Sequence, residues 1–157
     1  MIQRKQSVFL FLAFLLLLTG YFFPLCSFYG ENDSITLFLY KITSMVPDST
    51  MPYTFNFVLP LLVLNSLAAL MSFGTIFLYK NRKTQMKLVK LTLFLVVVYV
   101  GLFFLYYVDT LEKYTGSIAE YNYISVISPL VAIVFLVFAY RGILSDEKLV
   151  KSIDRLR

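Results

Sequence analysis

Four uninterrupted apolar runs dominate the pattern of hydrophobic and polar positions. They cover residues 7–28, 57–79, 88–108 and 118–140, the last beginning at Ile118 or at Tyr123. At 1.5 Å per residue, each run is long enough to cross a hydrocarbon core of about 30 Å as a helix. A helix is the form expected in lipid, because its backbone polar groups find partners within the segment. The pattern predicts an all-α fold: an integral membrane four-helix up-and-down bundle, forming a single domain over residues 1–157.

The basic residues indicate how the bundle is oriented. Of the 14 Lys and Arg residues, all except Lys41 and Lys113 lie before the first run, around the connection between the second and third runs, or after the fourth. Connections rich in Lys and Arg stay in the cytoplasm. We therefore expect a multi-pass membrane protein with both termini cytoplasmic and the connections at 30–56 and 109–116 outside.

Composition excludes an ordinary soluble domain. Hydrophobic residues make up 59% of the chain and charged residues 15%, with a mean hydropathy of +0.78. A soluble domain has about 45–50% apolar and about 25% charged residues. The net charge of +5 lies beside the apolar runs, which favours the lipid bilayer as partner over nucleic acid. We expect no nucleic-acid partner.

Residues for catalysis are scarce. The chain has no His, and the middle of each apolar run lacks an ionisable group that would activate a Ser or Thr hydroxyl. Phosphate-binding loops, zinc-ligand spacings and dinucleotide motifs are also missing from the sequence. We expect a protein that is not an enzyme, with no catalytic, metal or cofactor-binding residues and no cofactor. Cys26, the single cysteine, is expected to be buried near the end of the first helix.

A layer of small and polar residues is predicted at one depth, roughly 20 Å from the cytoplasmic surface. Its candidate site residues are Asn65, Ser66, Ser125, Ser128 and Pro129, accompanied by Thr19, Gly20 and Gly101. Pro129 removes the helical hydrogen bond to the Ser125 carbonyl. Two interpretations stay open: the layer packs and hydrogen-bonds helices together, or it lines a small outward-facing pocket for a lipid-like head group.

The longest external connection, residues 30–56, contains an apolar segment at 35–42 that is too short to span a membrane. This segment is expected to form a short strand or an interfacial helix, acting either as a simple cover for the helix ends or as a lid or docking surface. The connection at 109–116 is short and acidic and is expected to be a loop.

Residues 145–157 predict a separate cytoplasmic amphipathic helix. Ser145 is suited to cap it, and Asp146 and Glu147 suit its first turn. The candidate docking residues are Leu149, Lys151, Ile153, Arg155 and Leu156, with the apolar members at positions i, i+4 and i+7. This helix is expected either to lie on the anionic inner leaflet or to dock a cytoplasmic partner.

Both ends of the chain resemble a known family. The opening Met1-Ile2-Gln3-Arg4 with Gln6 and Ser7, and the ending Asp146-Glu147, Leu149-Val150, Ser152 and Asp154-Arg155-Leu156-Arg157, are similar to those of small Bacteroidota membrane proteins, the domain of unknown function family 4293. The resemblance implies four membrane spans and the inner membrane of a Gram-negative bacterium. It implies no activity and transfers no site residues.

Together these features favour a non-enzymatic accessory or scaffold subunit of a larger membrane complex, whose partners are other membrane or cytoplasmic protein subunits. The alternative is a carrier or binder of a lipid or small molecule that uses the layer of polar residues.

Overall fold

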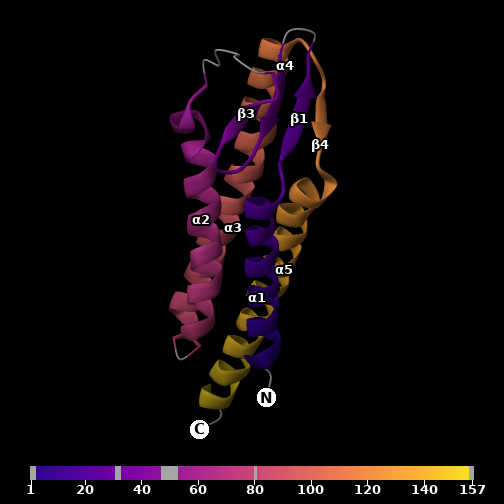
Figure 1. Ribbon diagram of the computed structural model, residues 1–157. Coiled ribbons are helices and arrows are strands. Elements are labelled where there is room, and N and C mark those ends of the chain that lie inside the picture. Colours follow the sequence, from indigo (N-terminus) through magenta and orange to yellow (C-terminus); the bar gives the residue numbers. More distant parts are fainter. Residues whose placement is uncertain (1–2, 31–32, 47–52, 80, 156–157) are drawn as a thin grey trace.

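The computed structural model describes residues 3–30, 33–46, 53–79 and 81–155, with the backbone alone at 3–4 and 150–155. The long helices are α1 (Gln3–Phe22), α2 (Phe55–Phe77), α3 (Arg82–Leu102) and α5 (Tyr123–Arg155) (Figure 1). α3 continues without a break through the π-helix η1 (Phe103–Val108) into α4 (Asp109–Thr115). Within the described residues, four helical segments are long and apolar enough to cross a membrane, as the hydrophobic pattern predicts.

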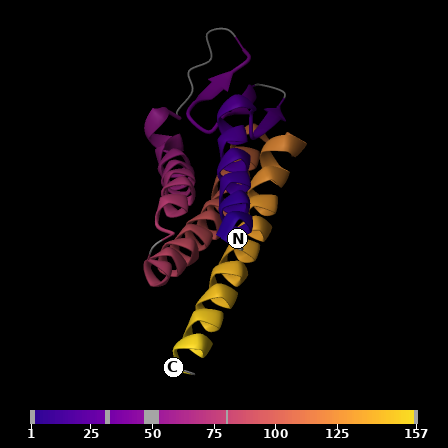
Figure 2. The same ribbon diagram turned by 90° about the horizontal axis from the view of Figure 1, so that it is seen from below.

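The four long helices form one bundle. α1 packs against α2 and α5, and α3 packs against the same two helices from the other side. The turn between α2 and α3 is short, so these two helices are antiparallel neighbours, and α1 begins at the end of the bundle where α5 finishes (Figure 1). Seen from below, the last part of α5 leaves the other three helices and projects beyond them (Figure 2).

The expectation of an all-α fold is wrong in one respect, because a small sheet caps the other end of the bundle. Its strands are β1 (Cys26–Tyr29), β2 (Ser34–Leu37), β3 (Ile42–Ser44) and β4 (Ala119–Tyr121). They are antiparallel in the order β3-β2-β1-β4, and Cys26 pairs with Leu37 on one side and with Tyr121 on the other. The cap therefore joins the connection between α1 and α2 to the connection between α4 and α5, which lie about 90 residues apart in the sequence.

The sheet takes up the end of the first apolar run and the residues before Tyr123 in the fourth, where Tyr123 is one of the two expected helix starts. α1 ends at Phe22 instead of at residue 28, since a residue before a proline disfavours the helical conformation and Pro24 follows closely. Cys26 is buried, as expected, but in β1 and not at a helix end. The fourth run is likewise divided, with β4 in its first part and α5 starting at Tyr123.

The two connections at the cap also differ from expectation. In the segment 35–42, the strand interpretation is confirmed by β2, and an interfacial helix there is wrong. The connection at 109–116 is helical, because α4 extends α3 and ends at Gly116, whose φ of 67° is the left-handed conformation that glycine adopts readily. Gly30 then lies so close to the end of α4 that a Cβ atom there would be 2.4 Å from the Thr115 carbonyl oxygen. Glycine is thus required where the cap meets α4.

Two hydrophobic clusters correspond to the bundle and the cap. In the bundle, fully buried alanines let the helices approach closely: Ala13, Ala68, Ala132 and Ala139. Under the sheet, the core contains Phe28 and Leu37 from the strands and Tyr107 and Leu111 from the η1–α4 extension. The extension therefore supplies one wall of the cap's core.

A separate amphipathic helix starting at Ser145 is also wrong, since α5 continues through this position. Ser145 is exposed, but its neighbours in the helix, Ile143 and Asp146, are buried against the rest of the bundle. Because packing and hydrogen bonding hold both sides of Ser145 in one helix, this serine does not cap a new one.

Candidate functional site

The predicted polar layer is divided between two helix interfaces. On the α1–α2 side, Asn65 Nδ2 donates a hydrogen bond to the Leu17 carbonyl at 3.1 Å. Ser66 Oγ donates to the Leu62 carbonyl and lies 2.7 Å from the Tyr21 hydroxyl. Each of these polar groups therefore has a partner, and together they join α2 to α1.

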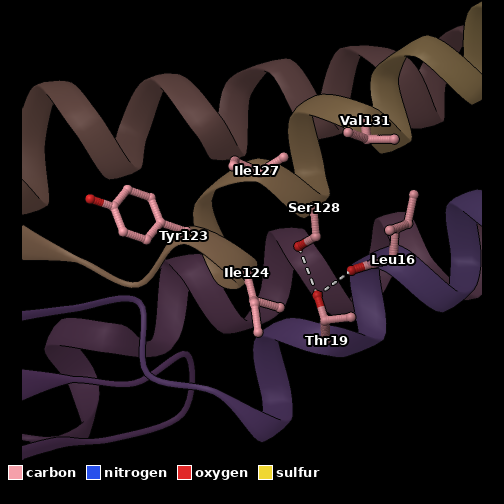
Figure 3. Close-up of a pocket in the computed structure, with 7 residues that line it drawn as sticks. All are labelled: Leu16, Thr19, Tyr123, Ile124, Ile127, Ser128 and Val131. Carbon is pink, nitrogen blue, oxygen red and sulfur yellow. Dashed lines mark hydrogen bonds between the residues drawn. The ribbon is translucent and has the colours of Figure 1, made fainter.

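On the α1–α5 side, Thr19 and Ser128 meet among the residues that line a groove (Figure 3). Thr19 Oγ1 lies 2.7 Å from Ser128 Oγ and 2.7 Å from the Leu16 carbonyl, so its single proton serves one of them at a time. The groove has a volume of about 320 Å³ and is lined by Leu16, Thr19, Tyr123, Ile124, Ile127, Ser128 and Val131. Its surface is almost entirely apolar, which suits a hydrocarbon chain.

Ser125 and Pro129 lie next to this groove in the sequence but are not among its lining residues. Because Pro129 has no N–H, the Ser125 carbonyl lacks its helical partner, and the Ser128 hydroxyl approaches it at 3.5 Å. The Ser125 side chain is 2% exposed, and its Oγ has no hydrogen-bond partner among the described residues. The structure thus brings Ser128 into the groove and leaves Asn65, Ser66, Ser125 and Pro129 outside it.

A second polar cluster lies at the opposite end of the bundle from the cap, and sequence reasoning missed it. Gln6 Nε2 donates to Asp146 Oδ2 at 2.5 Å, with both side chains buried. Arg82 donates to the Asp146 backbone carbonyl at 3.0 Å, and Gln85 donates to the Thr75 carbonyl at 3.2 Å. These contacts tie the first turns of α1 and α3 to α5 and α2. A signal was present, because Gln6 and Asp146 belong to the terminal motifs that resemble the family.

A third contact that sequence reasoning missed connects the η1 segment to α2. Tyr107 is 1% exposed, and its hydroxyl donates to the Phe57 carbonyl at 2.5 Å. The π-helical turn shifts the side-chain positions of the helix relative to an α-helix, which changes the faces on which Phe103–Val108 lie. The sequence carries no proline or glycine inside this segment that would have indicated the change.

The candidate docking residues lie on the projecting end of α5. Leu149 is 51% exposed, and Lys148 beside it is also exposed. Lys151, Ile153 and Arg155 lie on the helix with their backbone alone described. Leu156 lies outside the described residues.

The described residues offer little metal-binding or nucleophilic chemistry. In the described part of the chain, no group of three His, Cys, Asp or Glu side chains is placed to hold a metal ion. Cys26 lies under the cap, where burial, and to a smaller extent the Glu112 carboxylate, raises the pKa of its thiol to about 12. The thiol is therefore protonated and a poor nucleophile near neutral pH.

Comparison with known proteins gives one match. The model of a family described as Domain of unknown function (DUF4293) matches residues 2–156, which is nearly the whole chain and agrees with the resemblance of the two ends. Neither the curated proteins nor the solved structures contain a match to the chain.

Proposed function

The chain belongs to the family Domain of unknown function (DUF4293), and on that premise we propose that it is a non-enzymatic accessory subunit that docks a protein partner through the projecting end of α5. In this proposal the bundle spans the inner membrane, and the projecting end lies in the cytoplasm. The partner presents an apolar groove that accepts one face of a helix.

The length of α5 is the observation that carries this proposal. It has 33 residues, which correspond to about 50 Å, whereas a hydrocarbon core is about 30 Å thick. α2, by comparison, has 23 residues. Because β4 precedes Tyr123 at the cap, the extra length of α5 lies at the other end, where it leaves the bundle (Figure 2).

Continuity of α5 favours a protein partner over the membrane surface. An interfacial helix lies in the plane of the bilayer, and a chain that leaves a spanning helix must turn to reach that plane. α5 makes no such turn before Arg155. In the sequence of this end, Leu149, Ile153 and Leu156 recur at positions i, i+4 and i+7, the spacing found in helices that bind a groove on another protein.

The distribution of charge supports the proposed orientation. Lys5, Arg82 and Lys148 lie at the end of the bundle where α5 projects, and Glu112 and Glu120 lie at the cap. Positive residues are retained on the cytoplasmic side. The cap is accordingly proposed to face the outside of the inner membrane.

Truncation tests the docking proposal if it spares the Gln6–Asp146 contact. We would end the chain after Lys148, which removes the whole apolar face and keeps Asp146, and measure the partner that co-purifies in a mild detergent. The expected result is loss of one stoichiometric protein, with the melting temperature of the bundle unchanged. Recovery of the same proteins in equal amounts from both chains would contradict the proposal.

A matched pair of variants tests whether the apolar residues or the positive charges at the end of α5 bind the partner. Changing Leu149, Ile153 and Leu156 together to Gln is expected to release the partner, because the face that enters the groove is lost. Changing Lys148, Lys151 and Arg155 to Gln is the control, and it is expected to weaken binding by about tenfold or less. Equal loss in both variants would show that the apolar face is not the docking element.

A second candidate function is favoured by the groove between α1 and α5. Its almost entirely apolar lining fits the hydrocarbon part of a lipid-like molecule (Figure 3). Ile127→Trp would fill the groove, with Val134→Trp on the lipid-facing part of α5 as the control. Loss of one lipid species only in the groove variant would support this function, and identical lipid profiles in both variants would refute it.

A further inference from the structure

A second groove, between α3 and α5 at the end of the bundle from which α5 projects, combines positive charge with an apolar wall. It has a volume of about 260 Å³ and is lined by Lys83, Met86, Lys87, Lys90, Tyr140 and Leu144. The three lysines follow one face of α3 at positions i, i+4 and i+7. Tyr140 and Leu144 face them from α5.

The lysines are placed where their charges repel one another. Like charges at i, i+4 destabilise a helix, and positive charges are unfavourable near a helix N-terminus. α3 begins at Arg82, and its first turn contains no acidic residue. The groove lining, all of which is described, contains no carboxylate either. An anion in the groove would offset this concentration of positive charge.

One lysine is already held in the groove by its wall. Lys90 Nζ lies 5.3 Å from the centre of the Tyr140 ring, a distance at which a cation interacts with the ring face. Lys90 thereby stays between α3 and α5 while its ammonium group remains available to an anion. Met86 and Leu144 supply apolar surface beside it. The ligand that fits such a wall has both an anionic and an apolar part.

The position of the groove identifies the source of the anion. Lys90 is followed on α3 by the exposed apolar residues Leu91 and Phe94, which belong to a helical segment long and apolar enough to cross a membrane. We propose that this groove binds the phosphodiester head group of an anionic phospholipid, with the acyl chains continuing along α3. A basic pocket between membrane helices is suited to this class of ligand. The site goes beyond the docking function, which uses a different part of α5.

Native mass spectrometry of the purified full chain in detergent tests the site. The probes are phosphatidylglycerol, which is anionic, and phosphatidylcholine, which has the same phosphodiester but no net charge. Tight binding of phosphatidylglycerol over phosphatidylcholine is expected for the natural chain. Lys83→Gln, Lys87→Gln and Lys90→Gln are each expected to weaken it about fivefold. Equal binding of the two lipids by the natural chain would overturn the proposal.

The control variant removes three positive charges, as many as line the groove, from the same end of the bundle. Lys5, Arg141 and Lys148 are exposed and lie outside the groove, and changing all three to Gln is expected to leave phosphatidylglycerol binding within about twofold. A variant with Lys83, Lys87 and Lys90 all changed to Gln is the counterpart of this control. If the two triple variants lose binding equally, net charge and not the groove binds the lipid, and the proposal fails.

A steric variant provides a second test that keeps every lysine. Leu144→Trp fills the groove between α3 and α5, and it is expected to abolish the preference for phosphatidylglycerol. Unchanged preference in this variant would overturn the proposed location. Inorganic phosphate distinguishes the source of the anion, because displacement of the lipid by millimolar phosphate would show that the groove binds a free ion and not a lipid head group.

Discussion

Gln6 and Asp146, 140 positions apart in the sequence, form a buried hydrogen bond that fastens the start of α1 to α5. Gly142 lies beside this pair, and a Cβ atom there would be 2.9 Å from Gln6 Cγ. The contact therefore depends on a close approach of the two helices. It also gives a physical role to Gln6 and Asp146, which belong to the terminal motifs on which the family resemblance is based.

The first prediction concerns the free energy of unfolding that depends on this pair. Gln6→Leu is expected to lower it by about 2 kcal/mol, because the Asp146 carboxyl group would remain buried without its donor. Changing both Gln6 and Asp146 to Leu is expected to restore much of the loss. Denaturation by a strong detergent, followed by circular dichroism, measures each variant, and additive losses in the double variant would contradict this explanation.

The second prediction concerns Gly30, where the cap meets α4. Gly30→Ala is expected to destabilise the protein by more than about 2 kcal/mol, since the new methyl group would collide with the Thr115 carbonyl oxygen. Gly74→Ala in α2 is the matched control, because its Cβ would meet no atom within 4 Å. There the substitution is expected to be neutral or to stabilise by up to about 1 kcal/mol. Thermal melting compares the two, and similar shifts would refute the close approach at Gly30.

The third prediction concerns the reactivity of Cys26. The thiol is buried and its pKa is raised to about 12, so a maleimide at about pH 8 is expected to label the unfolded chain much faster than the folded one. Rapid labelling of the folded protein would show that the cap opens at this place.

The raised pKa of the Cys26 thiol also makes the stability of the protein depend on pH. A raised pKa in the folded state means that the folded protein holds its proton more tightly, so the contribution of Cys26 to stability is complete below pH 9.0 and is lost as pH rises toward about 12. Cys26→Ala is expected to unfold with a weaker pH dependence over this window. An identical pH dependence in the two chains would contradict this assignment.

The sequence predicted the parts of the fold that depend on long apolar runs. α2 and α3 follow directly from hydropathy because they are continuous and their connection is short and charged. The sequence left β2 as one of two alternatives and did not indicate β1 or β4, because strands of three or four residues are too short for an alternating pattern to separate from a helical one. β1 was also hidden in the first apolar run, where Cys26 and Phe28 are as apolar as the helix before them.

For the candidate site, the sequence predicted only the depth of the residues along the helices and their small or polar character. Counting residues placed Thr19 and Ser128 at one level, and the structure joins their hydroxyl groups. Residue counting did not indicate that Asn65 donates a hydrogen bond to α1 at a different helix interface, because the rotation of a helix about its axis depends on packing. The Gln6–Asp146 contact could not be derived from spacing, since it depends on α5 remaining helical through Ser145.

The central claim is that the projecting end of α5 docks a protein, and crosslinking inside the cell tests it most directly. A photoreactive amino acid would replace Leu149 near the end of α5, and Val134, exposed on the membrane-spanning part of the same helix, would be the matched control position. We predict that position 149 forms an adduct with one defined protein, the same one that co-purifies with the natural chain, and that position 134 does not. Adducts with lipid alone at both positions, or the same proteins at both, would contradict the proposed function.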